Sequence, residues 1–313
     1  MASRRRLLLP TVAAVAVLVV IVVVLSRMLA PSPITITTSN IRAVTSEPGM
    51  EWQPALSPDG SQVAFVARRG GRQSVVIRST RSIAGGGEIT PTQGPQGSME
   101  LLPAWSPDGE FVHFVSCPGS IVAVGVCSWM EVARLGGSIR SIALPSNAAL
   151  TSWSPDGSRV AFVTFSDSIF TYSISDGTTT LLAVPEVEEA LHSPVWSPDG
   201  RWIAYVNGNP RWLLSFNVSS SSIWIVAADG GEPVRVSGGA TLNVSPAWLD
   251  DRHLLFVSNR DGPREVYVAE VGPRGSRGEP RKVLGVTDPH TISYSIEGRK
   301  LAFSKATVRQ NIW

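Results

Sequence analysis

Four aspartates recur along the chain, each as the third residue of the tetrapeptide Ser-Pro-Asp-Gly: Asp59, Asp108, Asp156 and Asp199. Carboxylates from successive repeats could gather as a ring around one axis, where they could hold a metal ion or act as acid and base. The tetrapeptide itself offers a second interpretation. Proline pre-sets φ at the second position of a type I turn, aspartate suits the next position, and glycine suits the last. We therefore interpret the four aspartates as structural turn residues rather than catalytic residues.

The other residue types that carry chemistry form no recognisable site. The four histidines, His113, His192, His253 and His290, are far apart and have no metal-ligand spacing. His113 falls in a predicted strand, where a role in the core or at an interface is expected. The chain lacks the Gly-x-Ser-x-Gly nucleophile elbow, the His-Glu-x-x-His motif, a phosphate-binding glycine loop and an EF-hand loop. We therefore predict no catalytic residue, no metal site and no cofactor.

Cys117 and Cys127 are the only cysteines in the chain. They bracket the connection between the second and third predicted strands of one repeat, where a hairpin would bring its flanks together. In an extracytoplasmic compartment two cysteines in such a place indicate a disulfide. Two buried free thiols remain the alternative.

The segments around each turn predict strands. An aromatic residue stands before the turn in five of six copies, and proline lies two residues earlier in four copies, as Pro54, Pro103, Pro194 and Pro246. A short apolar segment that ends in an aromatic residue follows each turn, so strand, tight turn and strand form a hairpin.

The repeat predicts the fold. Two degenerate copies, at residues 248–252 and 294–299, bring the total to six copies at intervals of 43 to 52 residues. A third strand follows in each copy and a fourth in most, and four strands at this period are typical of a β-propeller blade. A β-sandwich would not repeat one unit six times, and the coils of a β-helix are shorter. We predict an all-β, six-bladed β-propeller over residues 41–313.

The two ends of this region suggest how the ring closes. Residues 41–45 resemble the fourth strand of a blade, and the sixth copy stops at Trp313 inside its third strand. We expect the N-terminal strand to complete the last blade and to cover its open edge. The abrupt stop indicates a fragment of a longer chain, or a frayed last blade.

Residues 7–25 carry no charge and form the only long apolar run. At 1.5 Å per residue, a helix of this length spans about 28 Å, close to the hydrocarbon thickness of a bilayer. We predict a basic cytoplasmic tail over residues 1–6, a transmembrane signal anchor over residues 7–26 and a linker over residues 27–40. A cleaved signal peptide is the alternative. The net charge of +2 says little about partners, but the lack of a basic patch argues against nucleic-acid binding.

Long, irregular loops are expected on the face of the ring opposite the Ser-Pro-Asp-Gly turns. Binding residues concentrate on loops that a rigid scaffold holds. Two of these loops, residues 185–193 and 207–222, contain the candidate partner-binding residues. These candidates are Glu186, Glu188, Glu189, Arg211, Trp212 and Phe216.

Residues 196–205 read Trp-Ser-Pro-Asp-Gly-Arg-Trp-Ile-Ala-Tyr, and residues 258–262 read Ser-Asn-Arg-Asp-Gly. With these motifs the chain, over about residues 40–313, resembles the TolB-like, WD40-like β-propeller repeat family. The resemblance implies a propeller like that of periplasmic TolB, of prolyl-oligopeptidase-type peptidases, or of bacterial sensors with a cytoplasmic kinase or winged-helix domain. The chain differs from those sensors because only six residues precede its apolar segment. No kinase, DNA-binding or peptidase residues can be transferred to it.

These observations predict a non-catalytic, membrane-anchored propeller that binds a protein or peptide outside the cytoplasmic membrane, as a scaffold or sensor domain. One membrane helix would hold it in the cytoplasmic membrane, with the N-terminus inside and the propeller in the periplasm or outside the cell. Three alternatives remain: the propeller of a fragmentary peptidase, the ectodomain fragment of a receptor kinase or winged-helix regulator, and a propeller that binds carbohydrate or metal in its central channel.

Overall fold

The computed structural model describes residues 36–45, 49–81, 88–89, 98–119, 127–164, 168–185, 190–209, 219–238 and 240–305. These residues form strands, turns and bends, and the prediction of an all-β fold is confirmed for them. Within these ranges no helix has the length and apolarity needed to span a bilayer. The predicted tail and anchor, residues 1–6 and 7–26, lie outside the described ranges. Thr37–Trp313 forms one compact unit, and the following description concerns this unit alone.

The strands form antiparallel groups that follow the sequence repeats, and we number these groups as blades 1 to 6. Blade 1 contains β1 (Met50–Leu56), β2 (Gln62–Arg69), β3 (Arg72–Ser79) and β4 (Glu88–Ile89). Blade 2 contains β5 (Met99–Trp105), β6 (Phe111–Cys117), β7 (Ser128–Ala133) and β8 (Arg140–Ser141). Blade 3 contains β9 (Ala148–Trp153), β10 (Arg159–Thr164), β11 (Ile169–Ser173) and β12 (Thr179–Ala183).

The second half of the unit continues this pattern. Blade 4 contains β13 (Leu191–Trp196), β14 (Trp202–Gly208), β15 (Ser221–Ala227) and β16 (Val234–Ser237). Blade 5 contains β17 (Asn243–Trp248), β18 (His253–Ser258), β19 (Glu265–Gly272) and β21 (Arg281–Lys282), with the additional short strand β20 (Gly275–Ser276) on β19. Blade 6 is described as the hairpin of β22 (Thr291–Ser295) and β23 (Lys300–Ser304).

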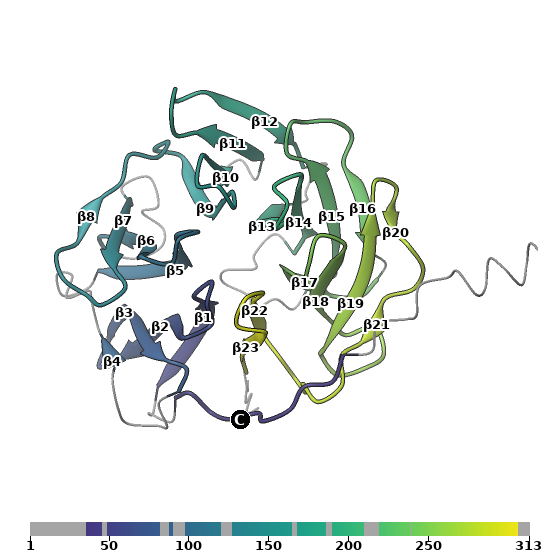
Figure 1. The fold of residues 1–313 in the computed structure, drawn as a ribbon, viewed down its shortest axis with the longest axis horizontal. Coiled ribbons are helices and arrows are strands. Elements are labelled where there is room, and N and C mark those ends of the chain that lie inside the picture. Colours follow the sequence, from purple (N-terminus) through teal and green to yellow (C-terminus); the bar gives the residue numbers. More distant parts are fainter. Residues whose placement is uncertain are drawn as a thin grey trace, which may run out of the picture. The chain divides into compact units, whose positions relative to one another are not determined.

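The first strands of the blades lie on the inside of the arrangement, around a common centre (Figure 1). Each first strand contacts the first strand of the next blade, in the order β1, β5, β9, β13, β17 and β22, and β22 contacts β1. The sequence of contacts therefore closes on itself. A radial arrangement of this kind leaves only short, protected sheet edges.

Hydrogen bonds join blade 6 directly to blade 1. The Leu56 N–H donates to Ser293 Oγ at 3.0 Å, and Ser295 Oγ donates to the Pro58 carbonyl at 2.6 Å. Lys300 Nζ donates to the Gly60 carbonyl at 2.7 Å. We call this contact between the first and last blades the seam.

The expected closing strand over residues 41–45 is not formed. In the described residues 36–45, the one β-bridge joins Thr37 in parallel to Leu284, at the end of blade 5. The segment then runs past blade 6 to blade 1 (Figure 1), where Arg78 Nη1 donates to the Val44 carbonyl at 2.8 Å. The prediction that this strand closes the ring is therefore corrected, because direct contacts between β22 and β1 make the seam. The third strand expected in blade 6 falls in residues 306–313, outside the described residues.

Hydrophobic side chains from neighbouring blades pack into shared cores. Val75 and Ile77 of blade 1 are buried against Trp105 and Phe114 of blade 2, and a similar cluster joins blades 3 and 4. Both faces of a middle strand are therefore covered, as in all six buried positions of β18. This explains why the apolar runs do not alternate cleanly with polar residues.

In blades 2, 4 and 5 the aromatic residue before the turn reaches the preceding blade. Trp105 Nε1 donates to the Ala55 carbonyl of blade 1 at 2.9 Å, and Trp248 Nε1 donates to the Val195 carbonyl of blade 4 at 3.2 Å. The Arg159 guanidinium of blade 3 lies 4.9 Å from the ring centroid of Trp196. The repeated aromatic thus fastens each of these blades to its neighbour while it fills the core between them.

Candidate functional site

Each Ser-Pro-Asp-Gly turn is closed by the same hydrogen bonds. In the first turn, Ser57 Oγ donates to Asp59 Oδ1 at 2.5 Å, and the Ser61 N–H donates to the same oxygen at 2.9 Å. The Gly60 N–H donates to the Ser57 carbonyl at 2.8 Å, with glycine in the left-handed region at a φ of 64°. The serine-to-aspartate bond recurs in the other three turns, made by Asp108, Asp156 and Asp199. The aspartates are therefore part of the turns, as interpreted from the sequence.

These hydrogen bonds keep the carboxylates ionised. The Ser57 hydroxyl and then the Ser61 N–H hold the pKa of Asp59 well below its usual range. The Ser154 hydroxyl and the Ser158 N–H lower the pKa of Asp156 to about 2. A carboxylate with such a low pKa is a poor general base or acid near neutral pH. Within the described part of the chain, no group of three or more His, Cys, Asp or Glu residues could hold a metal ion.

The degenerate turn of blade 5 keeps the hydrogen-bond pattern without proline and glycine. Asp250 Oδ1 accepts the N–H groups of Arg252 and His253, each at 2.8 Å. His253 Nδ1 lies 2.9 Å from the same carboxylate and adds a third contact. His253 therefore supports a turn, which gives this histidine a structural role.

His113 lies in the interface between blades 2 and 3. Its Nε2 atom is 3.2 Å from Glu131 Oε2, and its ring centroid is 4.6 Å from that of Trp153. Burial lowers the pKa of His113, and the nearby Glu131 carboxylate opposes this effect. The interface role expected from its place in a strand agrees with these contacts.

The structure has a disulfide between Cys117, the last residue of β6, and Cys127, which directly precedes β7. The Cα atoms of the two residues are 4.2 Å apart. The bond joins the two ends of the connection that the sequence analysis singled out, at the base of residues 120–126, which lie outside the described ranges.

The candidate partner-binding residues lie outside the described residues: Glu186, Glu188, Glu189, Arg211, Trp212 and Phe216. The base of the second loop is described. Gly208 and Ser221 pair at the end of the β14–β15 ladder, and the Ser219 N–H donates to Asn209 Oδ1 at 3.3 Å. Asn209 is buried and left-handed, with a φ of 53°. The loop therefore starts and ends on a fixed, hydrogen-bonded base.

A repeated bulge on the inner strands was not predicted from the sequence. In blades 1, 2, 4 and 5 the register of the first strand shifts by one residue, and the residue before proline is left-handed. These residues are Gln53, Leu102, Ser193 and Ser245, with φ values of 54°, 58°, 53° and 55°. A left-handed residue other than glycine is uncommon, and proline further restricts the residue before it. Blades 3 and 6 lack this proline, and their first strands pair without this bulge.

The bulges help to join the blades. Gln53 Oε1 accepts the Leu102 N–H of the next blade at 2.9 Å, and Ser245 Oγ accepts the Ile292 N–H of blade 6 at 2.9 Å. The four prolines were the signal that could have revealed this feature. Their repeated position, two residues before the position of the aromatic, marks the bulge.

Residues 135–312 match the family model of the TolB beta propeller domain. The chain belongs to this family. Among curated proteins, the Tol-Pal system protein TolB of Alcanivorax borkumensis is 35% identical over 94 residues. That match covers 29% of this chain and 19% of the relative, so it spans about a fifth of the relative's length.

Solved structures of two kinds share the fold. A putative TolB from Agrobacterium tumefaciens has a TM-score of 0.56 and 21% identity over 85% of this chain and 94% of its own. A structure from a study of two prolyl endopeptidases has a TM-score of 0.52 and 10% identity over 82% of this chain and 41% of its own. At these identities the likeness shows the propeller fold alone, and TolB propellers and propellers of enzymes both have this fold.

Proposed function

We propose that this TolB-family propeller is a non-catalytic, membrane-anchored domain that binds a protein or peptide outside the cytoplasmic membrane, as a scaffold or sensor. The main support for the proposal is that the four repeated aspartates have a structural role in the turns. Each of the four is held in a turn by hydrogen bonds from a serine and from the backbone. The most regular set of chemically capable residues thus serves the scaffold, which leaves the variable loops for recognition.

The proposed anchor is the apolar segment of residues 7–26, with the basic tail inside and the propeller in the periplasm or outside the cell. The resemblance to periplasmic TolB supports this location. The proposed fold is a six-bladed ring whose last blade continues into residues 306–313. No nucleic acid and no cofactor is part of this function.

The proposed recognition surface consists of the loops at residues 185–193 and 207–222. Trp212 and Phe216 would supply apolar contact area, and Arg211 would supply a charge-assisted donor. The fixed base at Asn209 and Ser219 supports this role, because a loop held at both ends loses less entropy on binding.

The main alternative is the propeller of a peptidase whose hydrolase domain is encoded beyond Trp313. It is supported by the fold likeness to the prolyl endopeptidase structure, of which this chain covers 41%. The gene sequence upstream and downstream of the region that encodes this chain distinguishes these alternatives. A nucleophile elbow downstream would favour the peptidase, and an upstream kinase or winged-helix domain would favour the receptor ectodomain.

Partner capture by the full chain in membranes tests the proposed surface. One variant replaces residues 210–218 with a Gly-Ser linker of equal length, and a control variant replaces residues 90–97, between β4 and β5 in the sequence, in the same way. We expect cross-linked partners to be lost with the first replacement and kept with the second. Equal capture by both variants would refute the proposed surface.

A further inference from the structure

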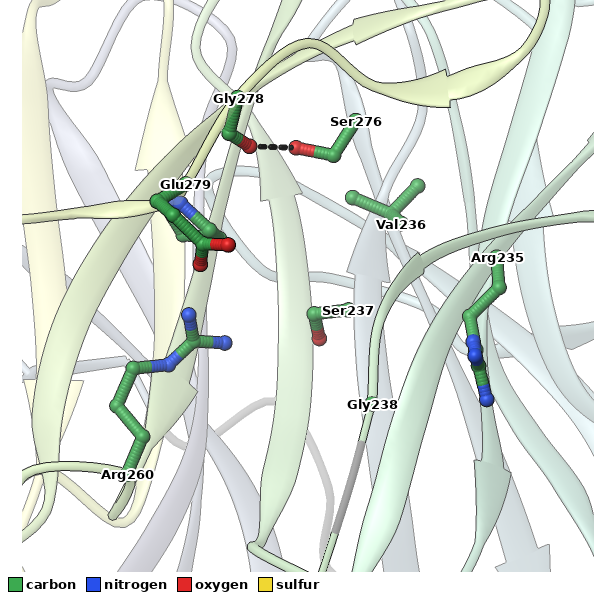
Figure 2. Close-up of a pocket in the computed structure, with 9 residues that line it drawn as sticks. Arg235, Val236, Ser237, Gly238, Arg260, Ser276, Gly278 and Glu279 are labelled. Carbon is green, nitrogen blue, oxygen red and sulfur yellow. Dashed lines mark hydrogen bonds between the residues drawn. The ribbon is translucent and has the colours of Figure 1, made fainter.

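A pocket lies on the outside of the propeller between blades 4 and 5. Its volume is about 510 Å³, and it is bordered by the end of β16 and by the segment that follows β20 (Figure 2). Its polar lining consists of Arg235, Ser237, Arg260, Ser276 and Glu279. Of the blades described, only blade 5 contains the additional strand that builds one wall.

The buried hydroxyl of Ser237 indicates that the pocket binds a ligand. Its side chain lines the pocket and is 7% exposed, and its Oγ atom has no hydrogen-bond partner among the described residues. A buried hydroxyl without a partner is unfavourable and is uncommon in native proteins. Figure 2 shows this residue between Arg260 and Arg235. A group bound there could accept the unused hydroxyl proton.

Arg260 is held in position before any ligand binds. Its guanidinium lies 5.0 Å from the ring centroid of Tyr267 and 5.4 Å from that of Phe256. Its Nη2 atom donates to Asn243 Oδ1 at 3.2 Å. No carboxylate of the described residues forms an ion pair with it, so the remaining donors can serve a bound anion. A positioned side chain has little conformational entropy left to lose on binding.

The pocket wall is fixed by two glycines. Gly275 is left-handed, with a φ of 95°, and a Cβ atom there would meet the Arg235 carbonyl at 2.5 Å. A Cβ atom on Gly238 would lie 3.0 Å from Arg235 Cδ. Larger residues would therefore push the hairpin away from β16 or displace Arg235. Both glycines keep the walls close together and the arginine in place.

The charge of the lining indicates the kind of ligand that the pocket could bind. The lining contains two arginines and one acid, Glu279, so it has a net positive charge. Guanidinium groups bind carboxylates through paired, charge-assisted hydrogen bonds. The β20 hairpin lies against β16, so the ligand must contact the polar side chains of the pocket rather than pair with the strand. We propose that this pocket binds a carboxylate side chain of an acidic peptide segment of a partner protein.

Binding of short peptides to the full chain in detergent tests the site. The probe is an acetylated and amidated peptide, Thr-Val-Glu-Val-Thr, and its control is the same peptide with glutamine. We expect the glutamate peptide to bind about tenfold more tightly or better, since a charge-assisted pair replaces a neutral one. Equal affinity for the two peptides would overturn the proposal. So would free acetate binding as tightly as the peptide, because the site would then not recognise a polypeptide.

Substitutions in the lining test whether the glutamate peptide binds in the pocket. Arg260→Gln and Arg235→Gln should each weaken the glutamate peptide about tenfold. Arg72→Gln, an exposed arginine of blade 1, should leave its affinity unchanged. Ser237→Ala should weaken binding several-fold without lowering Tm, because the hydroxyl that it removes has no partner in the protein. Unchanged affinity in Arg260→Gln and Ser237→Ala would overturn the site.

The choice of a polypeptide as ligand rests on the proposed binding function, but the two can fail separately. In one outcome, replacement of residues 210–218 leaves both partner capture and binding of the glutamate peptide unchanged. That result would refute the proposed loop surface and support the pocket. If capture depends on that loop and the peptide does not bind, the pocket fails and the proposed function stands.

Discussion

At the scale of single residues, one aspartate can maintain a turn after the residues that usually shape it are lost. In blade 5 the aromatic Trp248 is followed by Leu249, Asp250, Asp251 and Arg252, where the four intact turns have serine, proline, aspartate and glycine. Of the two aspartates, Asp250 accepts the backbone N–H groups, and Asp251 makes no hydrogen bond or ion pair with a described residue. The carboxylate therefore contributes more to this turn than the backbone preferences of proline and glycine.

This difference predicts opposite outcomes for adjacent substitutions. Asp250→Ala removes the acceptor of two backbone bonds and of the His253 contact, and should reduce the free energy of unfolding by about 1–2 kcal/mol. Asp251→Ala is the matched control and should change it by less than about 0.5 kcal/mol. Thermal unfolding followed by circular dichroism should show a Tm lower by about 2–6 °C for the first variant alone. Equal Tm values would contradict the assignment of Asp250 as the turn acceptor.

A second residue-scale prediction concerns pH. His192 is buried in β13, and burial lowers its pKa to about 3 from the usual 6.5. Below pH 6.5 the unfolded chain takes up a proton at this histidine and the folded chain does not, so stability is complete above that pH and falls as the pH decreases. The loss should reach about 2 kcal/mol at pH 5.

His192→Gln stays neutral at every pH and should remove this contribution. The measurement is the free energy of unfolding in urea at pH 8 and pH 5 for both proteins, and the change between the two pH values should be about 2 kcal/mol smaller in the variant. Comparison of the two differences cancels the other titrating groups. An identical pH dependence would show that His192 titrates normally.

At the scale of strands and blades, serine side chains make the contacts that fix neighbouring blades. Ser293 Oγ accepts the Leu56 N–H across the seam, and Ser245 Oγ accepts the Ile292 N–H between blades 5 and 6. Each serine replaces a backbone partner that an inner strand cannot find in its own sheet. Without it, a backbone N–H group would be left unsatisfied.

Hydrogen exchange can test each contact separately. Ser293→Ala should accelerate amide exchange at Leu56 about tenfold or more, because the amide loses its acceptor, and should leave Ile292 unchanged. Ser245→Ala should do the reverse, so each variant serves as the control of the other. Equal acceleration at both amides in either variant would indicate general loosening of the ring and would contradict separate contacts.

The limits of sequence prediction are visible in the same elements. The hairpins and the turns could be predicted because local signals, proline, aspartate, glycine and flanking apolar runs, determine them. The conformation of residues 41–45 could not be predicted in this way, because their alternating pattern fits any open strand edge. The neighbours of the N-terminal segment depend on contacts distant in sequence, such as that of Thr37 with Leu284. The pocket combines Ser237, Arg260 and Glu279 from two blades, and no spacing in the sequence brings them together.

At the scale of the whole molecule, the seam means that the ring does not require the N-terminal segment as a strand. The unit Thr37–Trp313 has its own closed set of contacts, in which β22 and β23 lie against β1. The segment before it is then available to connect the propeller to something else. Residues 7–25 contain no charged side chain, and residues 4–6 are all arginine, which is the pattern of an anchor with its N-terminus in the cytoplasm.

Membrane fractionation tests the proposed anchor. The full chain should remain in the membrane pellet after a carbonate wash, whereas a chain that begins at Thr37 behind a cleavable secretion signal should be released. Val17→Arg places a charge at the centre of the apolar run, which costs about 2.5–3.5 kcal/mol for insertion, and should shift much of the protein to the soluble fraction. Ala14→Val keeps the run apolar and should change nothing. Release of the full chain by carbonate, with an N-terminus near residue 31 by mass spectrometry, would instead identify residues 1–30 as a cleaved signal peptide and leave the propeller free outside the membrane.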